Sequence, residues 1–547
     1  MLPVVRARRA SRLLALLALV GLAACEAPPG GAPPGDVSLT VRGLQDGALL
    51  TGVVTIGAEV LGSRLEAMDV YVGDRRVARA MSAPFQVPLD TRLFADARVR
   101  VSVVGLVDAT DVTRSFDVTI DNTPPRVAVP ALASGVVYAS GDAVTFPVDV
   151  SDVSGVRELA VTVNGVSAVV NAAPPYVATL PLTSLGLTAA RLPMPLAVTV
   201  RAVDVAGVPG AWNGSATLRA RVAWQASTLG EVWAPPVFGA TGVAYFGSRD
   251  GKLYGVSPTG TPVGAPIAIG KEILFSPAVD VTGGVDRLWV SAGDSVVRVD
   301  PTKGQIAATF TAPSTLGTAP VLGPDGVFVG TFGGELVALD RESLTKRWSS
   351  TTSAPIESTP ALLAGGGVVF GSDDRFVHAV DATGAERWRL ETGGPVWSRP
   401  IAARSGGVLI GSHDGYLYRV GAAGEKLWEF DTRGQVWGGA AETATGDIYV
   451  GSTFGELVAL SATGQARWHK DVGGLAFATP VVASSGTVFV AGSSGTVYAF
   501  SPAGDIKWTH ALGAEVLGGV SLSKDESRLL VGTKARTVVA LYSGERP

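Results

Sequence analysis

The stretch Ala379-Val380-Asp381-Ala382-Thr383-Gly384-Ala385-Glu386-Arg387-Trp388 decides the fold, because related stretches return at intervals of 40 residues. The tryptophan that closes it is repeated at the same spacing, as Trp348, Trp388, Trp428, Trp468 and Trp508. Prolines and turn glycines keep the same period: Pro320, Pro360, Pro400, Pro480, Gly384, Gly424, Gly464 and Gly504. A fixed period of this length indicates stacked supersecondary units that bury each other's faces.

Each unit has the pattern of a four-stranded antiparallel sheet. Residues 360–388 contain an apolar strand, a glycine turn, a β-branched strand ending at Gly371, a third strand, and a fourth that carries the tryptophan. The register extends back to Pro236 and forward to Val520, which gives eight units. We therefore predict an all-β chain that ends in an eight-bladed β-propeller.

The last unit lacks its fourth strand, because 40 residues beyond Trp508 lies past residue 547. The segment Arg221-Val222-Ala223-Trp224-Gln225, just before the first unit, is expected to supply that strand and close the ring.

The AxDxxTGxxxW pattern of residues 379–388 resembles the tryptophan-docking repeat of pyrroloquinoline-quinone (PQQ) propellers, and the resemblance covers residues 221–547. It implies that the repeated tryptophans dock one blade on the next, although tryptophans of this kind also bind ligands. These positions are Trp224, Trp348, Trp388, Trp428, Trp468 and Trp508. Units one and two depart from the pattern with Gly264 and Ala308, so we expect looser blade contacts there.

The first 24 residues have the features of a signal peptide: arginines, then the apolar run from Leu13 to Ala24. A run of twelve residues is too short to span a bilayer as a helix. Leu22-Ala23-Ala24-Cys25 resembles the lipobox of bacterial lipoproteins, which implies cleavage before Cys25 and its lipidation. The alternative is an ordinary signal peptide with a chance cysteine. Glu26 after the cysteine favours the outer membrane in the lipoprotein family.

Residues 25–36 form a Pro/Gly-rich tether, and two segments with short alternating strands follow, at 37–123 and 124–220. Met68 to Val77 predicts a hairpin around Gly73-Asp74. Both segments resemble the tandem immunoglobulin-like domains of bacterial surface proteins. Asp121 and Asn122 between them fit either a plain turn or a calcium site, and the sequence does not decide whether calcium binds.

Composition excludes several function classes. The net charge of −4 and the lack of a basic run beyond the N-terminus argue against nucleic acid as a partner. Cys25 is the only cysteine, so no disulfide is expected. Quinone-dependent dehydrogenases, the enzymes of the PQQ class, hold quinone and calcium with Glu, Asn and Asp and often use a vicinal cysteine pair. Residues 221–547 contain neither Cys nor Asn.

General catalytic motifs are also missing: the sequence has no GxSxG, HExxH or Walker motif. His378, His413, His469 and His510 occupy different places in their repeats, and we expect them to be solvated or hydrogen-bonded surface residues. We therefore expect no enzyme activity, no cofactor and no metal, with a dehydrogenase as the remaining enzymatic alternative.

A column of residues three positions before each repeat anchor is the candidate binding site. It is expected at one mouth of the central channel and comprises Trp233, Leu274, Gly317, Glu357, Trp397, Trp437, Phe477 and Leu517. Within it, Trp397, Trp437 and Phe477 are expected to form an apolar sector beside Arg399. Aromatic residues and arginine are enriched at the centres of protein interfaces, although packing between blades explains the same column.

The combination of lipobox and PQQ-type propeller resembles the lipoprotein family that assists assembly of outer-membrane β-barrels. It implies a lipid-anchored envelope protein, on the periplasmic or surface side, that binds protein partners such as barrel-assembly components. The two immunoglobulin-like segments depart from that family and suggest spacers. A carbohydrate-binding or adhesion protein is the competing interpretation.

Overall fold

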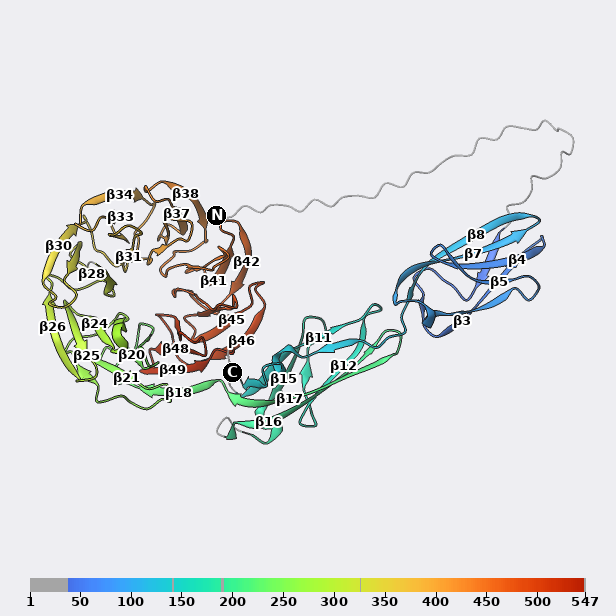
Figure 1. The fold of residues 1–547 in the computed structure, drawn as a ribbon, viewed down its shortest axis with the longest axis horizontal. Helices are drawn as coiled ribbons and strands as arrows, with labels where there is room; N and C mark the ends of the chain where they lie inside the picture. The colour runs from blue at the N-terminus through green and yellow to red at the C-terminus, as the bar shows by residue number, and fades with distance from the viewer. Residues whose placement is uncertain (1–37, 140–141, 188–190, 325, 546–547) are drawn as a thin grey trace, which may run out of the picture. The chain divides into compact units, whose positions relative to one another are not determined.

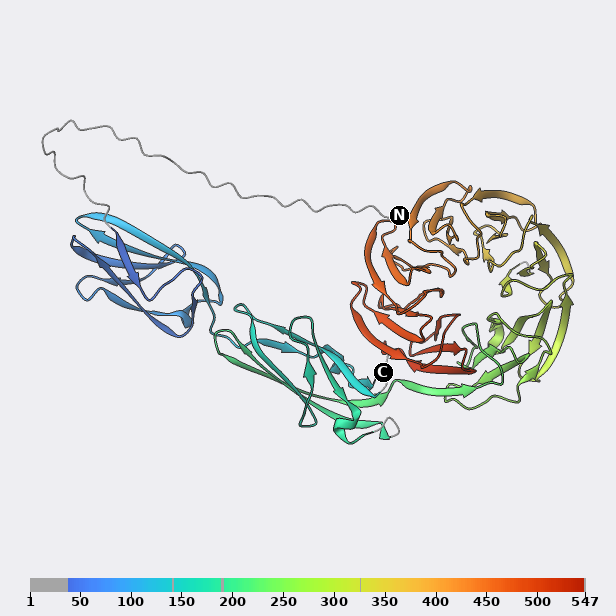
Figure 2. The same ribbon diagram turned by 180° about the vertical axis from the view of Figure 1, so that it is seen from behind.

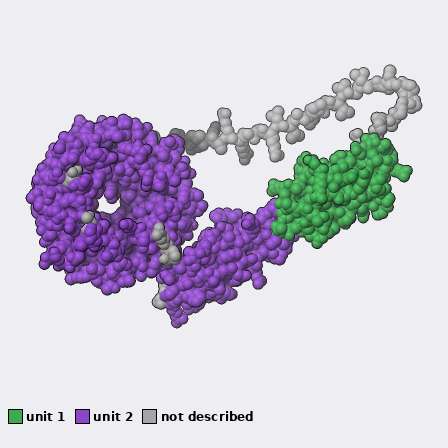
Figure 3. All heavy atoms as spheres, in the orientation of Figure 1, with its two compact units in different colours: residues 1–123 green, residues 124–547 purple. Residues whose placement is uncertain are grey.

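The computed structural model describes residues 38–139, 142–187, 191–324 and 326–545. The predicted signal peptide, Cys25 and the tether lie outside these residues. Everything described is built from β-strands and four short 3-10 helices, η1 (Thr91–Leu93), η2 (Pro130–Leu132), η3 (Leu182–Leu185) and η5 (Thr282–Gly284). Within the described ranges, no helix has the length and apolar character needed to cross a membrane. The chain divides into two compact units between Thr123 and Pro124 (Figure 3).

The first unit is a sandwich of two antiparallel-rich sheets. Its smaller sheet has the order β1 (Leu39–Arg42), β3 (Val53–Val60), β6 (Gln86–Asp90), and its larger sheet β2 (Leu49–Leu50), β8 (Thr110–Ile120), β7 (Ala97–Val107), β4 (Leu65–Val72), β5 (Arg75–Ala80). Alternate residues point into the core, so that Ile56, Val70 and Val101 are fully buried. The predicted hairpin is confirmed, because Val72 pairs with Arg75 around a turn with Gly73 at positive φ.

The second unit begins with another two-sheet sandwich. One sheet has the order β10 (Val136–Ala139), β17 (Pro209–Ala220), β16 (Met194–Asp204), β12 (Val156–Val163), β13 (Val166–Ser167), and the other β14 (Val169–Val170), β15 (Tyr176–Pro181), β11 (Ala143–Ser151), β9 (Arg126–Ala128). The alternation is again regular, and Val144, Phe146 and Val200 are buried between the sheets. We refer to it below as the second sandwich.

Four-stranded sheets arranged in a ring make up the rest of the second unit (Figures 1 and 2). The described residues form eight of them: β19 (Val237–Phe238), β20 (Ala244–Gly247), β21 (Lys252–Val256), β22 (Ile267–Ala268); β23 (Ala278–Asp280), β24 (Arg287–Ala292), β25 (Ser295–Asp300), β26 (Gln305–Thr311); β27 (Val321–Gly323), β28 (Gly326–Gly330), β29 (Glu335–Leu339), β30 (Lys346–Thr351); β31 (Ala361–Leu362), β32 (Val368–Gly371), β33 (Phe376–Val380), β34 (Glu386–Glu391); β35 (Ile401–Ala402), β36 (Val408–Gly411), β37 (Tyr416–Val420), β38 (Lys426–Asp431); β39 (Ala441–Glu442), β40 (Ile448–Gly451), β41 (Glu456–Leu460), β42 (Ala466–Asp471); β43 (Val481–Val482), β44 (Val488–Ala491), β45 (Thr496–Phe500), β46 (Ile506–Ala511); and β18 (Val222–Ser227), β49 (Thr537–Tyr542), β48 (Arg528–Thr533), β47 (Val520–Leu522). The predicted all-β, propeller-like fold is confirmed.

The ring closes as the sequence analysis expected. Strand β18 pairs antiparallel with β49, with Trp224 opposite Ala540 and Ser227 opposite Thr537. The first strand of the ring region therefore completes the last sheet, and this sheet has no free outer edge at β49.

The repeated tryptophans contact the turn of the following sheet. The indole N–H of Trp348 donates to the carbonyl of Ala382 (2.8 Å), and that of Trp388 to Ala422 (3.1 Å). Gly384 follows in the same turn at φ +86°, where an added Cβ would lie 2.5 Å from the Trp348 ring. The glycine of the repeat is thus required both by its backbone conformation and by the close approach of the indole.

The expectation of looser contacts in the second repeat unit is wrong. Ala308 stands at the outer tryptophan position, but it lies in one row with Arg298 and Trp289 across the sheet. Trp289 is fully buried, and its indole N–H donates to the carbonyl of Arg341 (3.0 Å), the turn position that corresponds to Ala382. A tryptophan two strands further in therefore fills the space that the outer position leaves open.

Candidate functional site

The residues of the predicted column lie on the face where the segments linking consecutive sheets meet the turns between second and third strands. Each turn donates a backbone N–H to the carbonyl two residues before a column member: Arg249 to Glu231, Asp373 to Pro355, His413 to Pro395, Thr453 to Gln435, Ser493 to Leu475 and Lys534 to Glu515, all at 2.9–3.0 Å. The linking segments and the turns together form this face, and the turn residues were not part of the prediction.

Three of the predicted aromatic residues come together, and a histidine joins them. The Trp397 and Trp437 ring centroids lie 5.3 Å apart, and Trp437 stacks on Phe477 at 4.6 Å. His413 lies 4.1 Å from Trp397 and 5.5 Å from Trp437. All four side chains are partly exposed. We call Trp397, His413, Trp437 and Phe477 the aromatic cluster.

His413 was expected to be a solvated or hydrogen-bonded surface residue, and this was wrong. Its Nε2 is buried and has no hydrogen-bond partner among the described residues. Burial lowers the pKa of His413 below its ordinary value, against the opposing charges of Asp373 and Asp414. At neutral pH the cluster is therefore an uncharged aromatic surface, with the imidazole stacked on one indole.

Two carboxylates border the aromatic cluster. Asp373 accepts a hydrogen bond from the indole N–H of Trp397 (2.5 Å). The carboxylate of Glu357 makes no hydrogen bond or ion pair with a described residue. Burial, with a contribution from the charge of Asp373, raises the pKa of Glu357 to about 7. The site therefore gains negative charge as the pH rises through neutrality.

We predict a pH-dependent stability effect of Glu357→Gln. The pKa of Glu357 is higher in the folded chain, about 7, than its ordinary 4.5, so the folded protein retains a proton that the unfolded chain releases. Stability therefore falls as the pH rises from about 4.5 to about 7, and Glu357→Gln removes this loss. The variant should unfold at a higher urea concentration than wild type at pH 8 and with little difference at pH 5.

The control is Glu391→Gln, which changes an exposed glutamate on β34. A pH-independent difference between wild type and Glu357→Gln would contradict the proposed cost of ionising this carboxyl group.

The other predicted site residues lie apart from the aromatic cluster. Trp233 donates its indole N–H to Glu231 (2.6 Å), and the Arg249 guanidinium lies over its ring, 4.6 Å from the centroid. Arg249 also pairs with Glu272 at 3.2 Å, so this sector is charged. Arg399 is exposed and forms no ion pair or cation–π contact with a described residue, although desolvation lowers the pKa of its guanidinium.

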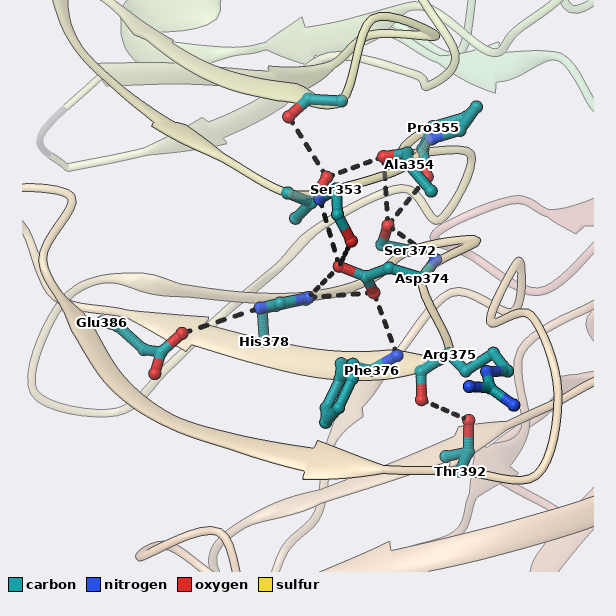
Figure 4. A network of polar contacts seen from close by, with 12 residues as sticks. Ser353, Ala354, Pro355, Ser372, Asp374, Arg375, Phe376, His378, Glu386 and Thr392 are labelled. Carbon is teal, nitrogen blue, oxygen red and sulfur yellow. Dashed lines mark hydrogen bonds and ion pairs between the residues drawn. The ribbon is translucent and has the colours of Figure 1, made fainter.

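The histidines do not converge, and two of them are buried. His378 is 7% exposed, and its Nε2 lies 3.1 Å from Asp374 in the network of Figure 4. Asp374 also accepts the backbone N–H of Phe376, while Ser372 donates to the carbonyl of Pro355. In another sheet the hydroxyl of Tyr418 donates to Asp414 (2.6 Å) from the corresponding position. His378 therefore has the same structural role as a tyrosine of the repeat, and His510, 8% exposed, is also internal.

Comparison with known proteins agrees with this geometry. The family described as "Outer membrane protein assembly factor BamB" matches residues 292–415 and 413–546. The ring is a PQQ-like propeller that resembles BamB. BamB from Moraxella catarrhalis is 18% identical over 58% of this chain and 98% of its own, with a TM-score of 0.50.

Two further structures share the fold. The computationally designed Ika8 protein is 17% identical over 59% of this chain and 99% of its own (TM-score 0.50), and Sqt1 of Saccharomyces cerevisiae is 13% identical over 59% and 98% (TM-score 0.51). At these identities the similarity establishes the propeller fold alone. No curated protein matches the sequence.

Proposed function

We propose that this chain is a non-catalytic lipoprotein of the cell envelope whose eight-bladed propeller binds a protein partner at the aromatic cluster. The two sandwiches are immunoglobulin-like spacers, and lipid on Cys25 holds the chain at the outer membrane, on its periplasmic or surface side. The similarity to an outer-membrane protein assembly factor supports this place and a role in assembly, with barrel-assembly components as candidate partners.

The observation that carries the proposal is the partly exposed aromatic cluster. Aromatic side chains dominate the energetic centres of protein interfaces, because they bury large areas with few rotatable bonds. The carboxylates of Glu357 and Asp373 beside Trp397 favour a partner segment that carries a Lys or Arg side chain. Such a cation interacts both with the indole faces and with the negative charge.

The proposed lack of catalysis is supported by the composition of the ring. Residues 221–547 contain no Cys and no Asn, two residue types that quinone-dependent dehydrogenases use at their cofactor. The buried histidine of Figure 4 is part of a structural network.

Site-specific photo-crosslinking in intact cells tests the proposal. A photoreactive amino acid at Leu475, which is 40% exposed on the binding face, should crosslink to a defined protein that mass spectrometry identifies. The same amino acid at Ile506, 59% exposed on outer strand β46, is the matched control. Crosslinks to glycan alone would favour the adhesion alternative, and equal protein crosslinks at both positions would contradict a specific site.

A further inference from the structure

A pocket within the second unit lies between the second sandwich and the ring. Its volume is about 330 Å³, at the small end of the range for ligand sites. Strands β10 and β11 contribute Tyr138 and Thr145, and the ring contributes Lys507, Trp508 and Glu545. Arg221, in the link between β17 and β18, also lines it. Most of the remaining lining is apolar, with proline, alanine and valine side chains.

Arg221 is unusual because it is a buried cation held between two rings. Only 6% of the residue is exposed, and its guanidinium carbon lies 4.3 Å from the Trp508 ring centroid and 4.8 Å from that of Tyr138. Its Nη1 donates to the carbonyl of Tyr542 (3.0 Å). Neither Nε nor Nη2 donates to a described residue, although a guanidinium has five N–H donors.

No described carboxylate balances the charge of Arg221. The nearest acidic side chain of the pocket, Glu545, pairs instead with Lys507 at 2.9 Å and accepts from Ser485. The charges of Arg219 and Arg528 also reach Tyr138. Burial, together with the charge of Arg221, lowers the pKa of His510 to about 4, so that this neighbour is neutral at pH 7. The described groups around the pocket therefore leave a net positive charge.

A buried cation is costly unless an anion or several hydrogen bonds compensate it. Burial lowers the pKa of Arg221 to about 9, and the aromatic rings replace only part of the lost hydration. A carboxylate in the pocket would pair with the guanidinium through charge-assisted hydrogen bonds. The apolar walls around Arg221 would at the same time bury a small hydrocarbon group.

We propose that this pocket binds a small monocarboxylate with an apolar body, whose carboxylate pairs with Arg221 and whose body packs among Tyr138, Trp508 and the apolar walls. The site belongs to the sandwich and the ring together, and it is independent of partner binding at the aromatic cluster.

Isothermal titration of the full chain with phenylacetate tests the proposal, with phenylacetamide as the neutral probe of the same shape. Phenylacetate should bind at least about tenfold more tightly, because only the acid pairs with the buried cation. Arg221→Met should reduce the affinity for phenylacetate to that for phenylacetamide.

A second variant separates binding from the structural role of Arg221. Thr145→Trp places an indole in the pocket from an exposed position on β11 and should weaken phenylacetate binding at least about tenfold. Thr113→Trp, at an exposed threonine on β8 of the first unit, should bind like wild type. Equal affinities for acid and amide, or unchanged binding by a folded Thr145→Trp protein, would overturn the proposal.

Discussion

Replacing Trp397 and Trp437 with alanine should abolish capture of the protein partner while the ring stays folded. Each indole contacts the other and His413, and both are partly exposed, so that truncation removes contact surface without opening a core. Truncation of an interface hot spot costs about 2 kcal/mol or more, and each single variant should therefore weaken binding about 30-fold. Co-purification and surface plasmon resonance with the crosslinked partner measure the loss.

The matched control for this pair is Ile506→Ala, which removes an exposed apolar side chain from the outer rim. Its affinity for the partner should equal that of wild type. If the double variant retained wild-type affinity with an unchanged circular dichroism spectrum, the aromatic cluster would be packing between sheets and not a binding site.

Trp289→Ala should destabilise the ring by about 3–5 kcal/mol, the usual cost of removing a large buried aromatic side chain. Trp289 is fully buried, and its indole N–H bonds to Arg341 of the next sheet. The variant therefore loses both core packing and a bond between sheets. Urea unfolding followed by circular dichroism measures the change in the free energy of unfolding.

The comparison for Trp289 is Trp388→Ala, since Trp388 also donates to a carbonyl of the next sheet but is only half-buried. A smaller loss is expected there. If Trp388→Ala destabilised the ring as much as Trp289→Ala, the assignment of Trp289 as the substitute for the missing outer tryptophan would be wrong.

The repeat made the architecture predictable, because its spacing is a property of local sequence. Positions such as Gly384 and Trp388 are fixed by a turn conformation and by contact with the adjacent unit, and both requirements recur in every copy. The closing role of the segment around Trp224 followed from the same period, because the last unit lacked one strand.

Residues outside the repeat pattern were not predictable in this way. Trp289 lies two strands from the position that it fills, and the sequence contains no sign that these strands align in one row. His413 comes from a turn that meets the linking segment of its own sheet, and its contact with Trp437 depends on the neighbouring sheet. The environment of Arg221 depends on Tyr138 and Trp508, which are far apart in sequence.

The pairing of β18 with β49 also sets a waiting time during biosynthesis. The hydroxyl of Thr228, next to β18, bonds to Arg536, 308 residues later in the chain. At ribosomal rates of about 5–20 residues per second, the early strand waits roughly 15–60 s for its partner. Until then its backbone donors and acceptors are open to other nascent chains, so export chaperones have a specific edge to protect. A circular permutant with β18 placed after β49 would avoid this interval.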